Sequence, residues 1–284
     1  MPWGRRIHPT AQTPSVFEAR TLSFLGLGII ALGVVFCLPP IPQDLSYHAF
    51  ADGRTMLGIP NFLNVASNLP FVVVGVLGLG LLLRHDAAQP DGPIRDGAER
   101  PPLMVLFAGV LLTGFGSSYY HLAPDNDRLV WDRLPMTVAF MGFFASTIGE
   151  RIGVRAGAWL LWPLVWLGLA SVLKWHMAEQ RDAGDLRLYG FVQFYPILAI
   201  PLMMYLFPAR YTRSGDVVQA LGWYVLAKVL EVGVIDRGIY ETGHVVSGHT
   251  LKHLAAALGA YWLYHRVRHR RPIRHEIRRS PRDA

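Results

Sequence analysis

Long apolar segments constrain this chain more than any other feature of its sequence. A helix needs about twenty apolar residues to cross the hydrocarbon core of a bilayer, and the sequence has eight such segments. Hydrophobic residues make up 52% of the 284 residues and charged residues only 17%. We therefore predict an all-α fold, a polytopic transmembrane helix bundle. The expected helices are 22–39, 62–83, 103–121, 130–148, 156–174, 188–207, 217–235 and 250–266.

The predicted organisation is one membrane domain with short polar ends. Residues 1–21 form an N-terminal segment, and the apolar run at 22–40 has the layout of a signal peptide. That run is long for a signal peptide and its Leu38-Pro39-Pro40 exit lacks a small-x-small cleavage pattern, which favours a retained extra N-terminal helix. Residues 41–266 are expected to hold the other seven helices, and residues 267–284 form a basic tail.

Arginine and lysine predict the orientation of the bundle. They are concentrated at the amino end, in the 84–100, 151–155 and 210–213 loops and in the tail, which places both termini in the cytoplasm. The net charge of +7 comes largely from the tail, which follows an apolar segment directly and therefore suits acidic membrane headgroups better than nucleic acid. The single cysteine, Cys37, excludes an intrachain disulfide and a cysteine metal cluster.

Two polar motifs stand at the ends of apolar segments. Ser117 and His121 are four residues apart, as are His249 and His253, so each pair shares one helix face. With eight crossings, both motifs and Asp132 fall on the non-cytoplasmic side of the membrane. Three imidazoles are the ligand number of a catalytic zinc with an open fourth position. We therefore predict zinc on His121, His249 and His253.

Asp132 and Ser117 are the predicted catalytic residues. Asp132 is expected to orient a metal-bound water or take its proton, and the Ser117 hydroxyl to hydrogen-bond the water or an oxyanion. Simpler interpretations exist for each motif alone. The histidine pair could be an interfacial polar pair, Ser117 a small packing residue, and Asp132 a partner of Arg128 or Arg133.

Two further polar pairs lie within apolar segments. Lys228 and Glu231 are three residues apart, so we expect them to neutralise each other as a buried ion pair. Ser67 and Asn68 precede Pro70, and we expect them to satisfy backbone groups that the proline leaves without partners.

Four motifs together resemble the successive motifs of the alkaline ceramidases, which belong to a seven-helix hydrolase superfamily that includes the adiponectin and progestin receptors. The motifs are N-V-A-S-N-L-P-F at 64–71, G-S-S-Y-Y-H at 116–121, D-R-L-P-M at 132–136 and G-H-T-L-K-H at 248–253. The resemblance covers about 47–264 and makes helix 22–40 additional to the seven family helices. It implies zinc on the three histidines, Asp132 and Ser117 at the metal-bound water, and hydrolysis of the N-acyl amide of ceramide or a ceramide-like lipid to a fatty acid and an amine base.

The chain departs from the family at two places. Asn61 stands where the eukaryotic relatives have an acidic calcium ligand, and with only Asp44 and Asp52 nearby the calcium ligand set is incomplete. Arg133 replaces the acidic residue that usually follows the aspartate, which changes the charge beside Asp132. Three alternative functions remain open: a receptor-like signalling protein with a structural zinc, a hydrolase of a different lipid amide or ester, and a transporter with an ion path formed by Lys228, Glu231 and Asp236.

Overall fold

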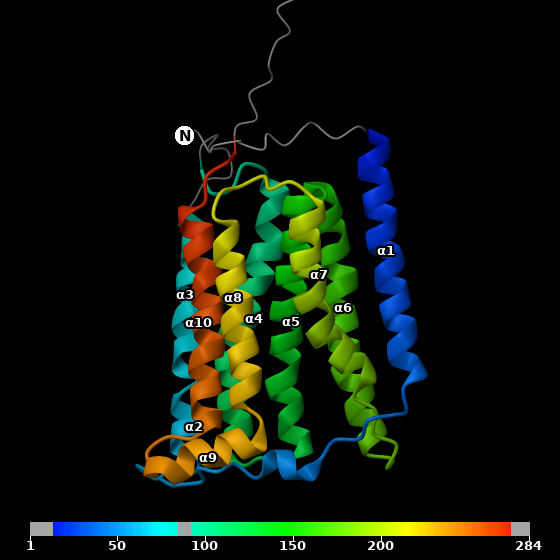
Figure 1. The fold of residues 1–284 in the computed structure, drawn as a ribbon. Coiled ribbons are helices and arrows are strands. Elements are labelled where there is room, and N and C mark those ends of the chain that lie inside the picture. The colour runs from blue at the N-terminus through cyan, green and yellow to red at the C-terminus, as the bar shows by residue number, and fades with distance from the viewer. Residues whose placement is uncertain (1–13, 85–91, 274–284) are drawn as a thin grey trace, which may run out of the picture.

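The computed structural model describes residues 14–84 and 92–273, and within these ranges the regular structure is helical, with no β-strand. The predicted all-α fold is therefore confirmed. Figure 1 shows long helices standing side by side in a bundle, with α9 lying across the lower end. The predicted segment 1–21 and tail 267–284 lie partly outside the described residues. The helices are α1 (Pro14–Cys37), α2 (Phe62–Ala66), α3 (Leu69–Arg84), α4 (Arg100–Leu122), α5 (Asn126–Arg151), α6 (Val154–Glu179), α7 (Arg187–Leu206), α8 (Ser214–Leu230), α9 (Gly233–Gly243) and α10 (Gly248–His269), with short 3-10 helices η1 (Leu45–His48) and η2 (Gly97–Glu99).

Several of these helices are long and apolar enough to cross a membrane. Five described segments have this character: α1, α2 with α3, η2 with α4, α6 and α7. A sixth is α8 with α9, if the two are taken as one span bent by 78°. The chain is thus a multi-pass membrane protein, as predicted. The count of seven helices plus one stays a prediction, because α5 and α10 carry more polar residues than the other long helices.

Three expected helices differ in detail from the observed ones. Helix α1 begins at Pro14, eight residues before the expected start at Leu22. The expected helix 62–83 is divided into α2 and α3 by the Ser67-Asn68 turn. The expected helix 217–235 ends at Leu230, and the chain then turns sharply into α9. Both interruptions occur where polar side chains make contacts with distant helices, described below.

The two ends of the bundle carry different polar clusters. Helix α4 ends, and α5 and α10 begin, at the lower end in Figure 1, where α2 and α9 also lie. At the opposite end, Glu150 of α5 forms ion pairs with Arg266 at 2.5 Å and Arg270 at 3.5 Å. The lower end therefore holds the predicted metal ligands His121, His249 and His253 and the predicted catalytic residues Ser117 and Asp132.

Candidate metal centre

Three buried histidines meet at the lower end of the bundle. His121 comes from the last turn of α4, and His249 and His253 come from the first turns of α10. Their candidate ligand atoms all lie within 4.8 Å of one another. The ring centroids form a nearly equilateral triangle, with separations of 4.9, 4.9 and 5.0 Å. The structure thus brings together the three residues predicted as ligands.

The spacing of these rings suits a single cation. The Nε2 atoms of His121 and His249 are 3.4 Å apart. Two nitrogens bound tetrahedrally to one ion at about 2.0–2.1 Å lie roughly 3.4 Å from each other. Among the described residues, this is the one group of three or more histidine, cysteine or acidic residues gathered closely enough to hold an ion. The group could therefore bind a metal ion through three imidazoles.

A hydrogen bond from α2 fixes the orientation of His253. The Ser67 hydroxyl donates to the Asn64 carbonyl at 3.2 Å, so its oxygen can accept a hydrogen bond from Nδ1 of His253 at 2.8 Å. Such a bond would leave Nε2 of His253 as the nitrogen free to bind a metal ion, as partner groups of metal-binding histidines commonly do. Ser67 does hydrogen-bond a backbone carbonyl, but that of Asn64 rather than that of Ala66, four residues before Pro70. Its contact with His253 was missed, because no spacing rule links residues 186 positions apart.

Asp236 of α9 positions the start of α10. Its Oδ1 atom accepts a hydrogen bond from the backbone N–H of His249 at 2.6 Å, and its Oδ2 atom accepts one from Ala51 at 3.2 Å. Gly248 allows this close approach, because a Cβ atom there would lie 2.6 Å from the Leu230 carbonyl oxygen. The sharp turn between α8 and α9 therefore delivers a carboxylate that holds the His249 backbone. Sequence reasoning did not identify this role.

Phe50 covers one side of the cluster. Its ring centroid lies 4.3 Å from that of His249 and 4.7 Å from that of His121. The Nδ1 atom of His121 has no hydrogen-bond partner among the described residues, so packing against Phe50 and Tyr120 holds this ring. An apolar ring in this position limits the access of water from the loop side.

The residues of the incomplete calcium set make protein contacts. Asn61 donates a hydrogen bond from its side chain to the His121 carbonyl at 2.9 Å, which holds the end of α4. Asp52 pairs with Arg54 at 2.8 Å, and these hydrogen bonds hold the pKa of the Asp52 carboxyl below its usual value. Asp44 accepts a hydrogen bond from the Ser46 N–H.

The predicted catalytic pair lies next to the histidines. Ser117 of α4 and Asp132 of α5 are 3% and 7% exposed, and the Ser117 side chain interacts with the Asp132 carboxyl group. The simpler interpretation of Asp132 as a partner of Arg128 does not hold, because the Arg128 side chain donates to the Ala123 carbonyl at 2.9 Å and forms an ion pair with Asp125 at 3.9 Å. Ser117, Asp132 and His253 all line one large cavity.

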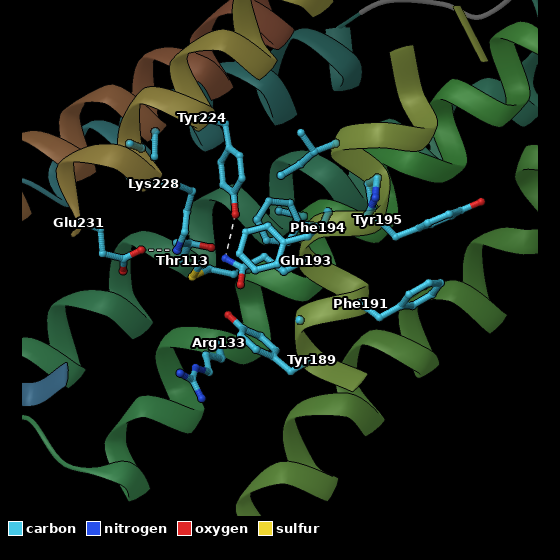
Figure 2. Close-up of a pocket in the computed structure, with 18 of the residues that line it drawn as sticks. Thr113, Arg133, Tyr189, Phe191, Gln193, Phe194, Tyr195, Tyr224, Lys228 and Glu231 are labelled. Atoms are coloured by element: carbon cyan, nitrogen blue, oxygen red, sulfur yellow. Dashed lines mark hydrogen bonds and ion pairs between the residues drawn. The ribbon is translucent and has the colours of Figure 1, made fainter. Parts of the chain in front are cut away.

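This cavity has a volume of about 740 Å³ and two kinds of wall. Most of its lining is apolar, from α1, α4, α5, α7, α8 and α10. Its polar side holds the ion pair of Lys228 and Glu231, which was predicted and is drawn in Figure 2. Glu231 also accepts hydrogen bonds from Lys252 at 2.5 Å and from the Tyr47 hydroxyl at 2.7 Å. An apolar chamber thus meets a polar site at the candidate metal centre.

No protein-family model matches this chain, and no curated protein matches it in sequence. The function is therefore inferred from the arrangement of the site itself.

Proposed function

We propose that this protein is an integral membrane zinc hydrolase that cleaves the N-acyl amide of ceramide or a ceramide-like lipid. One observation carries the proposal: three buried imidazoles meet beside a large apolar cavity, and His253, Ser117 and Asp132 line its polar side. The motif resemblance to the alkaline ceramidases supports the same reaction and the same lipid class.

Zinc is the metal that the donor set favours. Imidazole nitrogen suits zinc and other late transition metals, whereas magnesium and calcium prefer oxygen ligands. Three histidines leave a fourth tetrahedral position for water or substrate. When bound there, zinc would act as a Lewis acid and make its water acidic near neutral pH. His121, His249 and His253 would hold it, and Ser67 would fix the tautomer of His253.

The protein groups account for the proton transfers of amide hydrolysis. Asp132 would take a proton from the attacking water and deliver it to the leaving nitrogen. Ser117, whose side chain interacts with this carboxylate, would keep it oriented. The water oxygen forms a bond to the acyl carbon, the carbon–nitrogen bond breaks, and the nitrogen receives the proton. The products are a fatty acid and an amine.

The cavity suits a lipid substrate. Its volume lies within the range of about 300–1,000 Å³ that is common for ligand sites. Apolar side chains such as Phe140, Phe143 and Leu106 line its walls and would contact the acyl chain. Because the chamber reaches the His253 side chain, a lipid in it could present its amide to the polar site. We place the site near the non-cytoplasmic face, with both termini in the cytoplasm.

Zinc content and turnover of the purified protein test this proposal. We expect about one zinc per wild-type chain, loss of zinc in His249→Ala, and retention of zinc in Asp132→Asn together with a loss of N-acyl lipid hydrolysis of about 10²–10⁴-fold. His244→Asn is a matched control, because His244 is exposed in a left-handed conformation that asparagine also adopts.

Two results would contradict the proposal. Unchanged zinc in His249→Ala would exclude the three-histidine site. Full zinc occupancy without hydrolysis of any lipid amide or ester would favour the receptor-like alternative, in which the metal is structural.

A further inference from the structure

Arg133 is a buried arginine in the cavity wall whose charge has no carboxylate partner. It is only 5% exposed, and none of the carboxylates among the described residues forms an ion pair with it. The three other buried arginines, Arg151, Arg266 and Arg270, all pair with Glu150. Arg133 is thus the one buried arginine among the described residues that forms no ion pair with a carboxylate.

Aromatic rings surround the Arg133 guanidinium on several sides. Its central carbon lies 4.2 Å from the ring centroid of Trp175, 4.7 Å from that of Tyr189 and 5.8 Å from that of Tyr47. In Figure 2 the Arg133 side chain lies beside that of Tyr189. Contacts with ring faces attract a cation but accept no conventional hydrogen bond from its nitrogens. The rings therefore hold the guanidinium in place and leave its N–H groups to other partners.

Only part of the donor set of Arg133 is used. Its Nη2 atom donates to Oε1 of Gln43 at 2.6 Å, whereas the buried Nη1 atom has no partner among the described residues. A buried charged donor without an acceptor is costly, and a guanidinium presents donors that match an oxyanion. Since Arg133 lines the cavity, a bound molecule can supply that acceptor.

The charges around the cavity favour an acceptor with a single negative charge. The charged residues that line the cavity are the cations Arg133, Arg187, Lys228 and Lys252 and the anions Asp44, Asp132 and Glu231, an excess of one positive charge. Both lysines already pair with Glu231. Arg187 pairs with Asp185, so Arg133 is the lining cation that forms no ion pair among the described residues, and it lies one residue from the proposed catalytic carboxylate.

We propose that Arg133 binds a monoanionic oxyanion on the amine half of the lipid amide. The substrate class would then be N-acyl amino acids and related anionic N-acyl lipids rather than neutral ceramide. The acyl chain would contact the apolar walls, so the amine half stays at the polar side, where Arg133 lies. This inference rests on the proposed amide hydrolysis and replaces neutral ceramide, as its substrate, by an anionic N-acyl lipid.

A binding comparison tests Arg133 without requiring turnover. The full-length protein in nanodiscs of zwitterionic lipid would be titrated with N-palmitoylglycine, N-palmitoyltaurine and neutral N-palmitoylethanolamine. We expect the two anions to bind wild type at least about tenfold more tightly than the neutral amide, because hydrogen bonds to charged groups are strong. Arg133→Gln should abolish this preference. Arg155→Gln should retain it, because Arg155 is exposed at the start of α6.

Two results would overturn the inference: equal binding of neutral and anionic amides by wild type, or an anion preference that persists in folded Arg133→Gln. Arg133→Lys is a second variant if Arg133→Gln does not fold; it keeps the charge but loses the planar donors, and we expect a reduced preference for anions. Hydrolysis of the same three amides separates this inference from the proposed function. Selective binding without hydrolysis would support the anion site and reject the hydrolase. Hydrolysis of all three amides at equal efficiency would support the hydrolase and reject the anion site.

Discussion

Each of the three histidines is held by a different kind of contact. The His253 ring is hydrogen-bonded to Ser67, the His249 backbone to Asp236, and the His121 ring is packed against Phe50 and Tyr120. Among the described residues, the Ser67 hydroxyl is the one side chain outside the cluster that hydrogen-bonds a ring nitrogen of these histidines, Nδ1 of His253. The contribution of a single partner group to metal binding can therefore be measured at this ring.

Ser67→Ala should weaken zinc binding by about 10–100-fold, because a partner group of this kind orients its histidine and selects the tautomer. Competition with a chromophoric chelator measures the affinity. Ser146→Ala is the control, since the Ser146 hydroxyl donates to the Phe143 carbonyl within α5, away from the histidines. Equal affinities in wild type and Ser67→Ala would show that packing alone orients His253.

The ion pair at the start of α7 should produce a pH-dependent stability. Hydrogen bonds from Arg187 lower the pKa of Asp185 to about 2, and Arg187 also donates to the Leu38 carbonyl at 2.5 Å beside the end of α1. The pKa of aspartate in an unfolded chain is about 3.9. Because the folded pKa is the lower one, the stabilisation is complete above about pH 4 and declines as the pH falls toward 2.

We therefore expect Asp185→Asn to lower the melting temperature at pH 7, and this difference from wild type to shrink between about pH 4 and pH 2. Thermal unfolding in detergent at several pH values measures it. Asp182→Asn is the matched control on the same loop, where the side chain is exposed. A difference that stays constant down to pH 2 would contradict the assignment.

At the scale of elements, the close packing of α4 against α5 brings Ser117 and Asp132 together. Gly116 makes this approach possible: a Cβ atom there would collide with the carbonyl oxygen of Trp131 and lie 3.2 Å from Cγ of Pro135. Gly116 and Trp131 each directly precede a member of the Ser117–Asp132 pair. The spacing of these two helices and the geometry of the pair are thus set at the same point.

Gly116→Ala should destabilise the protein by about 1–3 kcal/mol, the usual cost of overpacking. The added Cβ would meet the Trp131 backbone, which cannot move to another rotamer as a side chain can. Hydrolysis should fall as well, since Ser117 and Asp132 move apart. Gly80→Ala provides the comparison within a helix: no atom lies within 4 Å of a Cβ placed there, so stability should be equal or higher. Thermal unfolding of both variants measures the effect, and an unchanged Gly116→Ala protein would refute this view of the helix contact.

For the whole molecule, polar clusters at opposite ends join helices that are distant in sequence. The histidines connect α4 with α10 at one end, and Glu150 connects α5 with α10 at the other. The apolar cavity occupies the bundle interior between α5, α7, α8 and α10. Since a cavity weakens packing, the charged contacts at the far end are expected to contribute strongly to the stability of the bundle.

Glu150→Ala should lower the free energy of unfolding by about 3–5 kcal/mol, because it leaves buried arginines without their carboxylate. Denaturation in mixed detergent measures the change. Glu241→Ala removes an exposed carboxylate from α9 and should alter stability by no more than about 0.5 kcal/mol. Similar losses of unfolding free energy in the two variants would mean that the Glu150 ion pairs stabilise the bundle no more than an exposed carboxylate does. Zinc binding should persist in folded Glu150→Ala, since the cluster lies at the other end of the bundle.

The sequence by itself determined the helical membrane fold and nominated the residues that meet at the histidine site. Apolar length identifies helices that can cross a membrane, and i, i+4 spacing places two histidines on one face, because both are local properties of the chain. The Lys228–Glu231 ion pair was predicted for the same reason.

Only the tertiary structure decided which neighbours complete the site. Ser67, Asp236 and Phe50 reach the histidines through the breaks and turns of the chain, and residue periodicity within a helix carries no information on contacts between different elements. The unpaired guanidinium of Arg133 is likewise a property of packing. A sequence gives the charge of an arginine, but the presence or absence of a carboxylate beside it depends on how the helices come together.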